Sequence, residues 1–281
     1  MNSNKIITRE EIEAYFYCSL GYRYQYNLDI PYREQDKNKL FVQGAKYAVS
    51  SWFDSIAKGR SRKKARNRMG LRLDLIWRNL RFNPEDYPMA HAMIMQILLE
   101  LESNFRESRD LIIGGGLTAT MPLAGWGITD TIDGVFIQNG NKAHLPRSKR
   151  PIVGVQVASD FPPDRNPNIL RLRHAIAKYS LNVGSGDVFG KGHPPKLLVL
   201  YVPSMRARTY ELEHEEYKEV IWLARSALRA LDANVYAQST SVNRCKSCWY
   251  QHECSNYFTV PEPSVPKLGK LRRSVQDRLD A

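Results

Sequence analysis

The placement of four cysteines constrains this chain more than any other feature of its sequence. Cys18 stands alone near the start, whereas Cys245, Cys248 and Cys254 form a C-x2-C-x5-C motif near the end. Thiolates two residues apart can bind one metal centre, and four sulfur ligands suit a tetrahedral zinc ion or an iron–sulfur cluster. A zinc ribbon usually pairs two C-x2-C motifs, whereas here one ligand lies more than 220 residues from the others. This spacing favours the iron–sulfur cluster.

The chain also carries an excess of positive charge. Its 281 residues include 41 lysines and arginines against 29 acidic residues, which gives a formal net charge of +12. Such a balance attracts polyanions, and the cations are concentrated between Lys58 and Arg68. We predict that this run contacts the phosphate backbone of single- or double-stranded DNA. The candidate DNA-binding residues are Arg60, Arg62, Lys63, Lys64, Arg66 and Arg68.

The sequence gives no sign of a membrane or secretion segment. No stretch approaches the roughly 18 uninterrupted apolar residues that a membrane helix needs. The opening residues, MNSNKIITREEIEAY, carry charges where a signal peptide would place its apolar stretch. We therefore expect a cytoplasmic protein with no membrane partner.

Hydrophobic periodicity predicts helices in the first third of the chain and strands after it. Thr8 and Glu11 form a T-x-x-E capping box at the start of a helix that reaches Cys18. The pattern predicts an α/β fold in which a sheet is covered by helices, the alternative being a mostly helical protein with a small sheet. Further helices are expected at 40–57, 62–81, 86–108, 167–182 and 213–231, and strands within 117–140 and at 151–159, 196–202 and 206–212.

The order of these segments resembles a known family. A helix with a lone cysteine, continued by CSLGYRYQY, precedes a glycine-bearing helix, the segment GITDTID, an apolar strand, a helix, another strand and the C-x2-C-x5-C motif. Over residues 8–258 the chain is similar to the iron–sulfur branch of the PD-(D/E)XK nuclease superfamily. This branch includes the AddB-type and RecB-like exonucleases and the CRISPR adaptation nuclease of the same build. The resemblance implies a 4Fe-4S cluster, DNA as ligand, and a helicase, nuclease or CRISPR adaptation protein as partner.

The resemblance also divides the chain into four regions. A helical N-terminal region, 1–113, carries Cys18 and the basic run, and a restriction-endonuclease-like core with a mixed sheet flanked by helices follows at 114–232. The cysteine segment, 233–258, closes onto Cys18. Residues 259–281 are rich in proline and charge and are expected to form a flexible tail.

The catalytic chemistry of this family depends on charged groups from two adjacent strands. Carboxylates hold Mg²⁺ or Mn²⁺ at the scissile phosphate, while a lysine stabilises charge or positions the attacking water. By its place in GITDTID, Asp130 matches the metal-binding aspartate. Asp133 matches the second acid, which is usually structural.

Four positions depart from the family pattern. Gln156 stands where the second strand should present an acid, and Ala158 stands where it should present the lysine. Ala175 and Tyr179 occupy the positions of a Q-x3-Y pair, and no histidine follows Gly44. A hard Mg²⁺ ion would therefore keep one carboxylate where it needs at least two.

Three interpretations follow. We expect an iron–sulfur protein of nuclease fold that binds DNA and whose nuclease activity is weak or lost. The alternative is an active DNA exonuclease or endonuclease with relocated catalytic residues around Asp130. A second alternative is a basic zinc-binding adaptor of unrelated fold, which would be colourless after anaerobic purification.

Overall fold

The structure, a computed structural model, describes most of the chain between Lys5 and Ala237. The chain divides into two units, Met1–Ala237 and Gln238–Ala281. The described residues are 5–28, 37–108, 110–139, 146, 149–159, 167–184, 195–202, 204, 206–211, 213–237, 245, 248, 250 and 254. The expected tail at 259–281 lies outside them.

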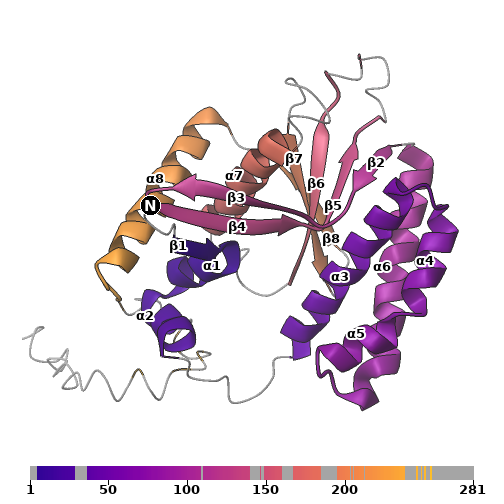
Figure 1. The fold of residues 1–281 in the computed structure, drawn as a ribbon, viewed down its shortest axis with the longest axis horizontal. Coiled ribbons are helices and arrows are strands. Elements are labelled where there is room, and N and C mark those ends of the chain that lie inside the picture. Colours follow the sequence, from indigo (N-terminus) through magenta and orange to yellow (C-terminus); the bar gives the residue numbers. More distant parts are fainter. Residues whose placement is uncertain are drawn as a thin grey trace, which may run out of the picture. The chain divides into compact units, whose positions relative to one another are not determined.

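A mixed five-stranded sheet forms the centre of the first unit (Figure 1). Its strands, in spatial order, are β2 (Leu111–Gly114), β5 (Gly134–Ile137), β6 (Ile152–Ser159), β7 (Pro195–Val202) and β8 (Arg206–Tyr210). The strands β6 and β7 are parallel, and the other neighbouring pairs are antiparallel. Parallel neighbours need a crossover connection, which contains the helix α7 (Pro167–Gly184).

A three-stranded sheet brings the beginning of the chain beside its middle. The strand β4 (Trp126–Ile132) lies between β1 (Lys5–Thr8) and β3 (Leu117–Leu123). It is parallel to β1 and antiparallel to β3. A tight turn joins β3 to β4, and Gly125 adopts its positive φ of 82° without the steric cost that a side chain would add. Asp133 then connects β4 to β5, so the chain passes directly from one sheet to the other.

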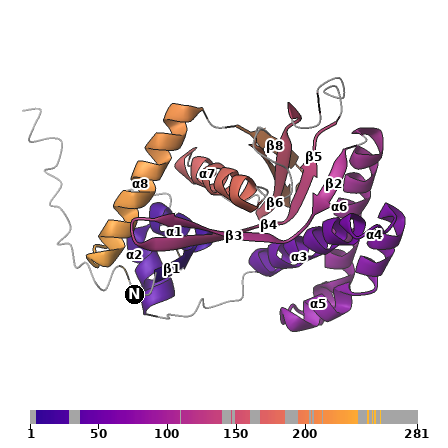
Figure 2. The same ribbon diagram turned by 45° about the horizontal axis from the view of Figure 1, so that its top comes forward.

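Helices cover both faces of the five-stranded sheet (Figures 1 and 2). Alternate residues of β6 point to opposite faces, as the pleat of a strand requires. Val155 and Val157 pack into the core with one group of helices, whereas Ile152 and Ala158 pack into the core on the side of α7. The first group of helices consists of α3 (Lys37–Ala57), α4 (Arg62–Gly70), α5 (Leu73–Asn79) and α6 (Tyr87–Ser108).

The N-terminal helix packs in a second core together with the three-stranded sheet. This core contains Ile12, Ile128, Leu172 and Leu228, all fully buried. They come from α1 (Arg9–Tyr17), β4, α7 and α8 (His214–Asp232) respectively. After α1 the chain continues through α2 (Ser19–Tyr22) and the π-helical turn η1 (Arg23–Asn27). The beginning of the chain is thus fixed against elements made more than a hundred residues later.

Two sequence features account for local helix geometry. The Thr8 hydroxyl accepts from the Glu11 N–H at 3.2 Å, and the Glu11 carboxylate accepts from the Thr8 N–H at 2.6 Å, so the capping box begins α1. Gly44 lets the Trp77 ring lie against α3, because a Cβ at this position would come within 2.1 Å of that ring. The glycine in this helix therefore has a packing role.

The predicted α/β class, with a mixed sheet flanked by helices, is confirmed. The single helix expected at 62–81 is wrong, since α4 ends at Gly70 and α5 begins at Leu73. Glycine is a weak helix former, and a tight turn follows it, in which the Arg72 N–H donates to the Met69 carbonyl at 2.8 Å. Among the described helices, none has the length and apolar character required to span a membrane.

Candidate functional site

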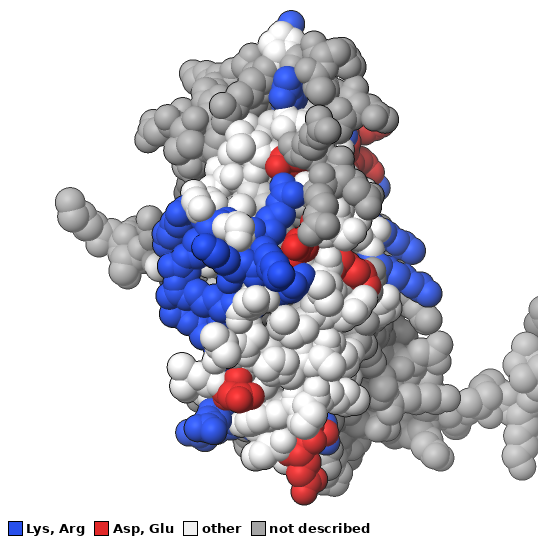
Figure 3. Space-filling view, turned by 90° about the vertical axis from the view of Figure 1, so that its right-hand side faces the viewer, with Lys and Arg blue, Asp and Glu red and all other residues white. Residues whose placement is uncertain are grey.

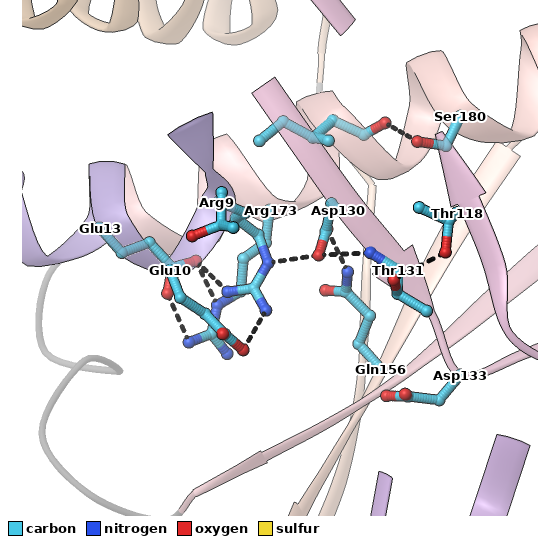
Figure 4. A network of polar contacts seen from close by, with 12 residues as sticks. Arg9, Glu10, Glu13, Thr118, Asp130, Thr131, Asp133, Gln156, Arg173 and Ser180 are labelled. Carbon is cyan, nitrogen blue, oxygen red and sulfur yellow. Dashed lines mark hydrogen bonds and ion pairs between the residues drawn. The ribbon is translucent and has the colours of Figure 1, made fainter. Parts of the chain in front are cut away.

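Asp130 lies buried on β4 with both carboxylate oxygens bonded (Figure 4). Its Oδ1 accepts from the Arg9 side-chain Nε and from the Thr131 backbone N–H, both at 2.9 Å. Its Oδ2 accepts from the Gln156 amide at 2.5 Å. Asp130 and Gln156 are thus in direct contact across the two sheets. The Gln156 Oε1 has no hydrogen-bond partner among the described residues.

Arg9 belongs to a buried network of two arginines and two carboxylates. Its Nη1 donates to Glu13 Oε1 at 2.6 Å, one turn along α1. Arg173 of α7 binds the same carboxylate through Nε at 2.7 Å and Nη2 at 3.0 Å. Burial opposes these charges, but the neighbouring opposite charges outweigh it, so the pKa of Arg9 is raised and that of Glu13 is lowered. The network is therefore charged and internally neutral.

Asp133 has a different role from Asp130. Its backbone N–H donates to the Val155 carbonyl at 2.8 Å, and its carboxylate accepts from the Val157 N–H at 2.8 Å. These bonds hold the junction of β4 and β5 against β6. Burial raises the pKa of Asp133 to about 7, and the opposing effect of the Lys46 charge does not offset it.

A cavity of about 390 Å³ lies beside Asp130, between α1, α3 and β4. Its charged lining residues are Arg9, Glu10, Lys46, Asp130 and Asp133. Lys46 and Glu10 form an ion pair, as do Arg9 and Asp130. A divalent cation at Asp130 would have to displace the buried guanidinium of Arg9. Gln156 of β6, where the family pattern expects a second acid, offers only an amide. These residues do not fit a Mg²⁺ or Mn²⁺ ion.

Three of the other candidate positions lie in the hydrophobic core or at its edge. Ala158 is 5% exposed and packs with Ala177 and Tyr201. Ala175 is fully buried, and Tyr179 packs at the edge of the core that contains α1 and α8. None of these three side chains carries a charge toward Asp130. A lysine introduced at residue 158 would enter an apolar environment.

Sequence reasoning missed Arg9 and Glu13 as partners of the candidate catalytic aspartate. Arg9 and Asp130 are 121 residues apart, and Arg173 and Glu13 are 160 residues apart. The one available signal was the Arg9–Glu13 spacing of four residues within a predicted helix, which allows an ion pair on one face. That signal does not reveal the contact with Asp130.

The cysteines fall in different units. In the first unit the Cys18 Sγ accepts from the Gly21 N–H at 3.4 Å, at the start of α2. In the second unit the Cys248 N–H donates to the Cys245 carbonyl at 3.2 Å, and the Cys254 N–H donates to the Tyr250 carbonyl at 2.9 Å. The described residues contain no group of three or more His, Cys, Asp or Glu arranged to hold a metal ion. The four-cysteine site therefore stays a prediction.

The basic run lies on α4 and the turn before it, and Figure 3 shows lysines and arginines gathered on one face of the molecule. Lys63 and Lys64 are exposed. Over the described ranges, neither lysine has an acidic partner. Arg66 differs, because its Nη1 binds the buried Glu102 of α6 at 2.5 Å. Arg60 is exposed, and Arg62 and Arg68 are half-buried. Five of the six candidate residues thus present charge at this surface, while Arg66 also contributes to packing.

Comparison with known proteins finds solved structures of low sequence identity to this chain, among them the following two. The first is a candidate exonuclease from Eubacterium rectale, with 13% identity, 85% of each chain covered and a TM-score of 0.48. The second is the protein SSO0001, with 12% identity, 92% of this chain and 90% of that chain covered, and a TM-score of 0.36. No protein-family model and no curated protein matches the chain.

Proposed function

We propose that this chain is a DNA-binding protein of nuclease fold that does not cleave DNA. The observation that carries the proposal is the contact between the Arg9 guanidinium and Asp130 at 2.9 Å. The aspartate that resembles a metal ligand is neutralised by a side chain of the same protein. Gln156, at the expected position of a second acid, donates to it at 2.5 Å and adds no negative charge.

The loss of activity follows from electrostatics. Phosphodiester hydrolysis needs a metal held by fixed negative charge and a cation that offsets the charge developing on the phosphate. Removal of one preorganised electrostatic partner costs about 10² to 10³ in rate. With Gln156 and Ala158 at two such positions, and Arg9 bound to the remaining acid, activity should fall to background.

A nuclease assay tests this proposal directly. Purified protein should leave single- and double-stranded DNA intact with either Mg²⁺ or Mn²⁺. Robust cleavage that Asp130→Ala abolishes would overturn the proposal. Cleavage that survives Asp130→Ala would instead indicate a contaminating nuclease, which a repeat preparation must remove before the comparison counts.

A working nuclease with relocated residues around Asp130 is the second candidate function. One observation favours it, since Glu10, Asp133 and Lys46 line the same cavity as Asp130. This candidate requires that cleavage depend on Glu10 or Lys46 as well as on Asp130. Glu10→Gln and Lys46→Gln, assayed beside Asp130→Ala, separate it from the proposal above.

DNA binding is supported by the exposed charge of α4. Each phosphate contact releases condensed counterions, so affinity should fall steeply with salt. Titration of a labelled duplex and of a labelled single strand over a series of salt concentrations measures the slope. An affinity for both that does not change with salt would contradict a phosphate-backbone contact.

We further propose that the four cysteines bind a 4Fe-4S cluster. Four thiols match the ligand set of such a cluster. Ser19 and Leu20, directly after Cys18, are hydrogen-bonded to Ala237. Cys245 follows Ala237 by eight residues in the sequence. A bound cluster would join residues from near the two ends of the sequence.

Anaerobic purification tests the cluster. The protein should be brown, with iron and sulfide each near about four per chain, because four thiolates satisfy four irons. Cys18→Ala should lower the thermal midpoint as well as the colour, since metal binding is coupled to folding. Stoichiometric zinc without iron in a colourless protein would overturn the proposal and favour the zinc adaptor.

A further inference from the structure

Leu71 protrudes from the surface where α4 meets α5. Its side chain is 88% exposed, and that of Leu75 is 60% exposed. Single exposed leucines are common on protein surfaces and need no explanation. Leu71 is the C-cap residue of α4 and Leu75 lies in the first turn of α5, so both exposed leucines belong to the junction of these two helices.

The backbone around Leu71 is held in place. The Leu71 N–H donates to the Asn67 carbonyl at 3.3 Å, and the Arg72 N–H donates to the Met69 carbonyl at 2.8 Å. Met69 and Leu73, two residues to either side of Leu71, are buried in the core of the helical group. The exposure of Leu71 is therefore set by a fixed turn between two anchored residues.

Basic residues precede and follow this exposed leucine in the sequence. Lys64, Arg72 and Arg78 are exposed, Arg68 is half-buried, and one acidic residue of this stretch, Asp74, is exposed as well. Lys64, Arg68 and Leu71, the C-cap residue of α4, follow one another at intervals of four and three residues, the spacing of one side of α4. Leu75 and Arg78 are three residues apart on α5 and share one side of that helix. Figure 3 shows the lysines and arginines gathered on this face. Phosphate contacts explain the cations but give no reason for an apolar side chain among them.

We propose that Leu71 is a wedge that enters between stacked base pairs of duplex DNA while the flanking cations bind the phosphates on either side. The inference rests on the proposed DNA binding and specifies how the DNA is held. Apolar wedges of this kind enter from the minor groove, unstack a base step and kink the duplex. The net positive charge of the basic residues near Leu71 in the sequence is complementary to DNA. The Leu71 side chain would make an apolar contact with the faces of two adjacent base pairs.

The wedge predicts a preference among DNA sequences. Unstacking costs a few kcal/mol per step, and the cost is lowest where a step is flexible, mismatched or damaged. The protein should therefore bind a duplex with one mismatch more tightly than the matched duplex, by about tenfold, and bend it. A surface that binds only phosphates would not distinguish the two.

The experiment compares three proteins on two duplexes. Wild type, Leu71→Ser and Leu99→Ser are titrated against matched and singly mismatched duplexes that carry a fluorophore at each end. Leu99 of α6 is the matched control, since it is 44% exposed and the exposed Ala92 and Gln96 on its side of the helix are uncharged. Circular dichroism confirms that each variant is folded.

We expect Leu71→Ser to lose the preference for the mismatch and the end-to-end energy-transfer change that reports bending. Its salt dependence should remain that of the wild type, because the phosphates are still bound. Leu99→Ser should behave as the wild type does. Retention of both mismatch preference and bending in Leu71→Ser would overturn the wedge but leave DNA binding intact.

The experiment also distinguishes failure of the wedge from failure of DNA binding itself. If the wild type binds neither duplex at low salt, DNA binding itself is wrong, and the wedge is overturned with it. If DNA binding is unaffected by Leu71→Ser while binding to vesicles of anionic lipid is lost, the leucine serves a membrane surface, which also overturns the wedge.

Discussion

The Asp130 network and the α4–α5 face both gather arginines, but they use the charges in opposite ways. In the network, Arg9 and Arg173 are less than 8% exposed, and each binds a buried carboxylate. On the α4–α5 face, Lys63 and Lys64 point to solvent. In the Asp130 network the charged groups bind one another and hold α1, β4 and α7 together. On the α4–α5 face the lysines remain exposed, where a ligand could bind them.

This difference separates two consequences of removing a charge. Loss of one partner from a buried pair leaves the other uncompensated in a poorly solvated site, which costs folding stability. Loss of an exposed cation changes stability little but weakens attraction to a polyanion. Stability and DNA affinity should therefore respond to different arginines and lysines.

The largest effect is expected for Arg9→Gln. This change leaves Asp130 without its cation and removes one of the two arginines that bind Glu13, so the free energy of unfolding should fall by about 3 to 5 kcal/mol. Urea unfolding followed by circular dichroism measures the loss. Lys63→Gln is the control and should change stability by less than about 0.5 kcal/mol. Equal effects of the two substitutions would contradict the distinction between the regions.

The next effect concerns Asp133 and pH. Because burial raises its pKa to about 7, the folded protein binds this proton more tightly than the unfolded chain does. Its contribution to stability is therefore present near pH 4 and is lost as the pH rises to 7. Asp133→Asn should match the wild type near pH 4 and exceed its stability at pH 8 by about 2 to 4 kcal/mol. An unchanged difference between pH 4 and pH 8 would show that this carboxylate has an ordinary pKa.

Arg66 shares a feature with each region, because it lies on α4 and also binds the buried Glu102, and we expect an intermediate result for it. Arg66→Gln removes the 2.5 Å ion pair with Glu102 and should lower the free energy of unfolding by about 1 to 2 kcal/mol. It should also weaken DNA binding slightly. Arg66→Gln combined with Glu102→Gln should recover part of the stability and none of the affinity, which denaturation and DNA titration measure separately.

Replacing Arg62, Lys63 and Lys64 together by glutamine should have the smallest effect on stability and the clearest effect on DNA affinity. DNA affinity should fall by about tenfold. The slope of log affinity against log salt concentration should become shallower, as expected for the loss of up to about three phosphate contacts. Thermal unfolding should move by no more than a few degrees. Glutamine at Lys5, Lys37 and Lys218, three exposed lysines outside this face, is the matched control. An unaltered salt slope would show that α4 is only a solvated helix face.

The sequence predicted most of the architecture because its signals were local. The capping box at Thr8 and the periodic pattern of α6 each depend on residues within a few turns of one another. The break between α4 and α5 was missed because Gly70 is tolerated within many helices. The Arg9–Asp130 contact was missed for a different reason, since no spacing rule links a helix start to a strand 121 residues later. The departures at Gln156 and Ala158 could be read from the sequence, but the guanidinium bound to the candidate metal ligand could not.

The parallel pairing of β1 with β4 has a consequence for the order in which the chain folds during synthesis. The ribosome releases Lys5–Thr8 and Arg9 well before their partners Trp126–Thr129 and Asp130, which emerge more than a hundred residues later. The helices α3 to α6 lie between them and make mainly local contacts, which form quickly. The nascent chain should therefore complete its helical region while its own first strand is still unpaired. β1, although made before β4, is thus among the last strands to reach its native place, and pulse proteolysis of stalled nascent chains would detect this delay.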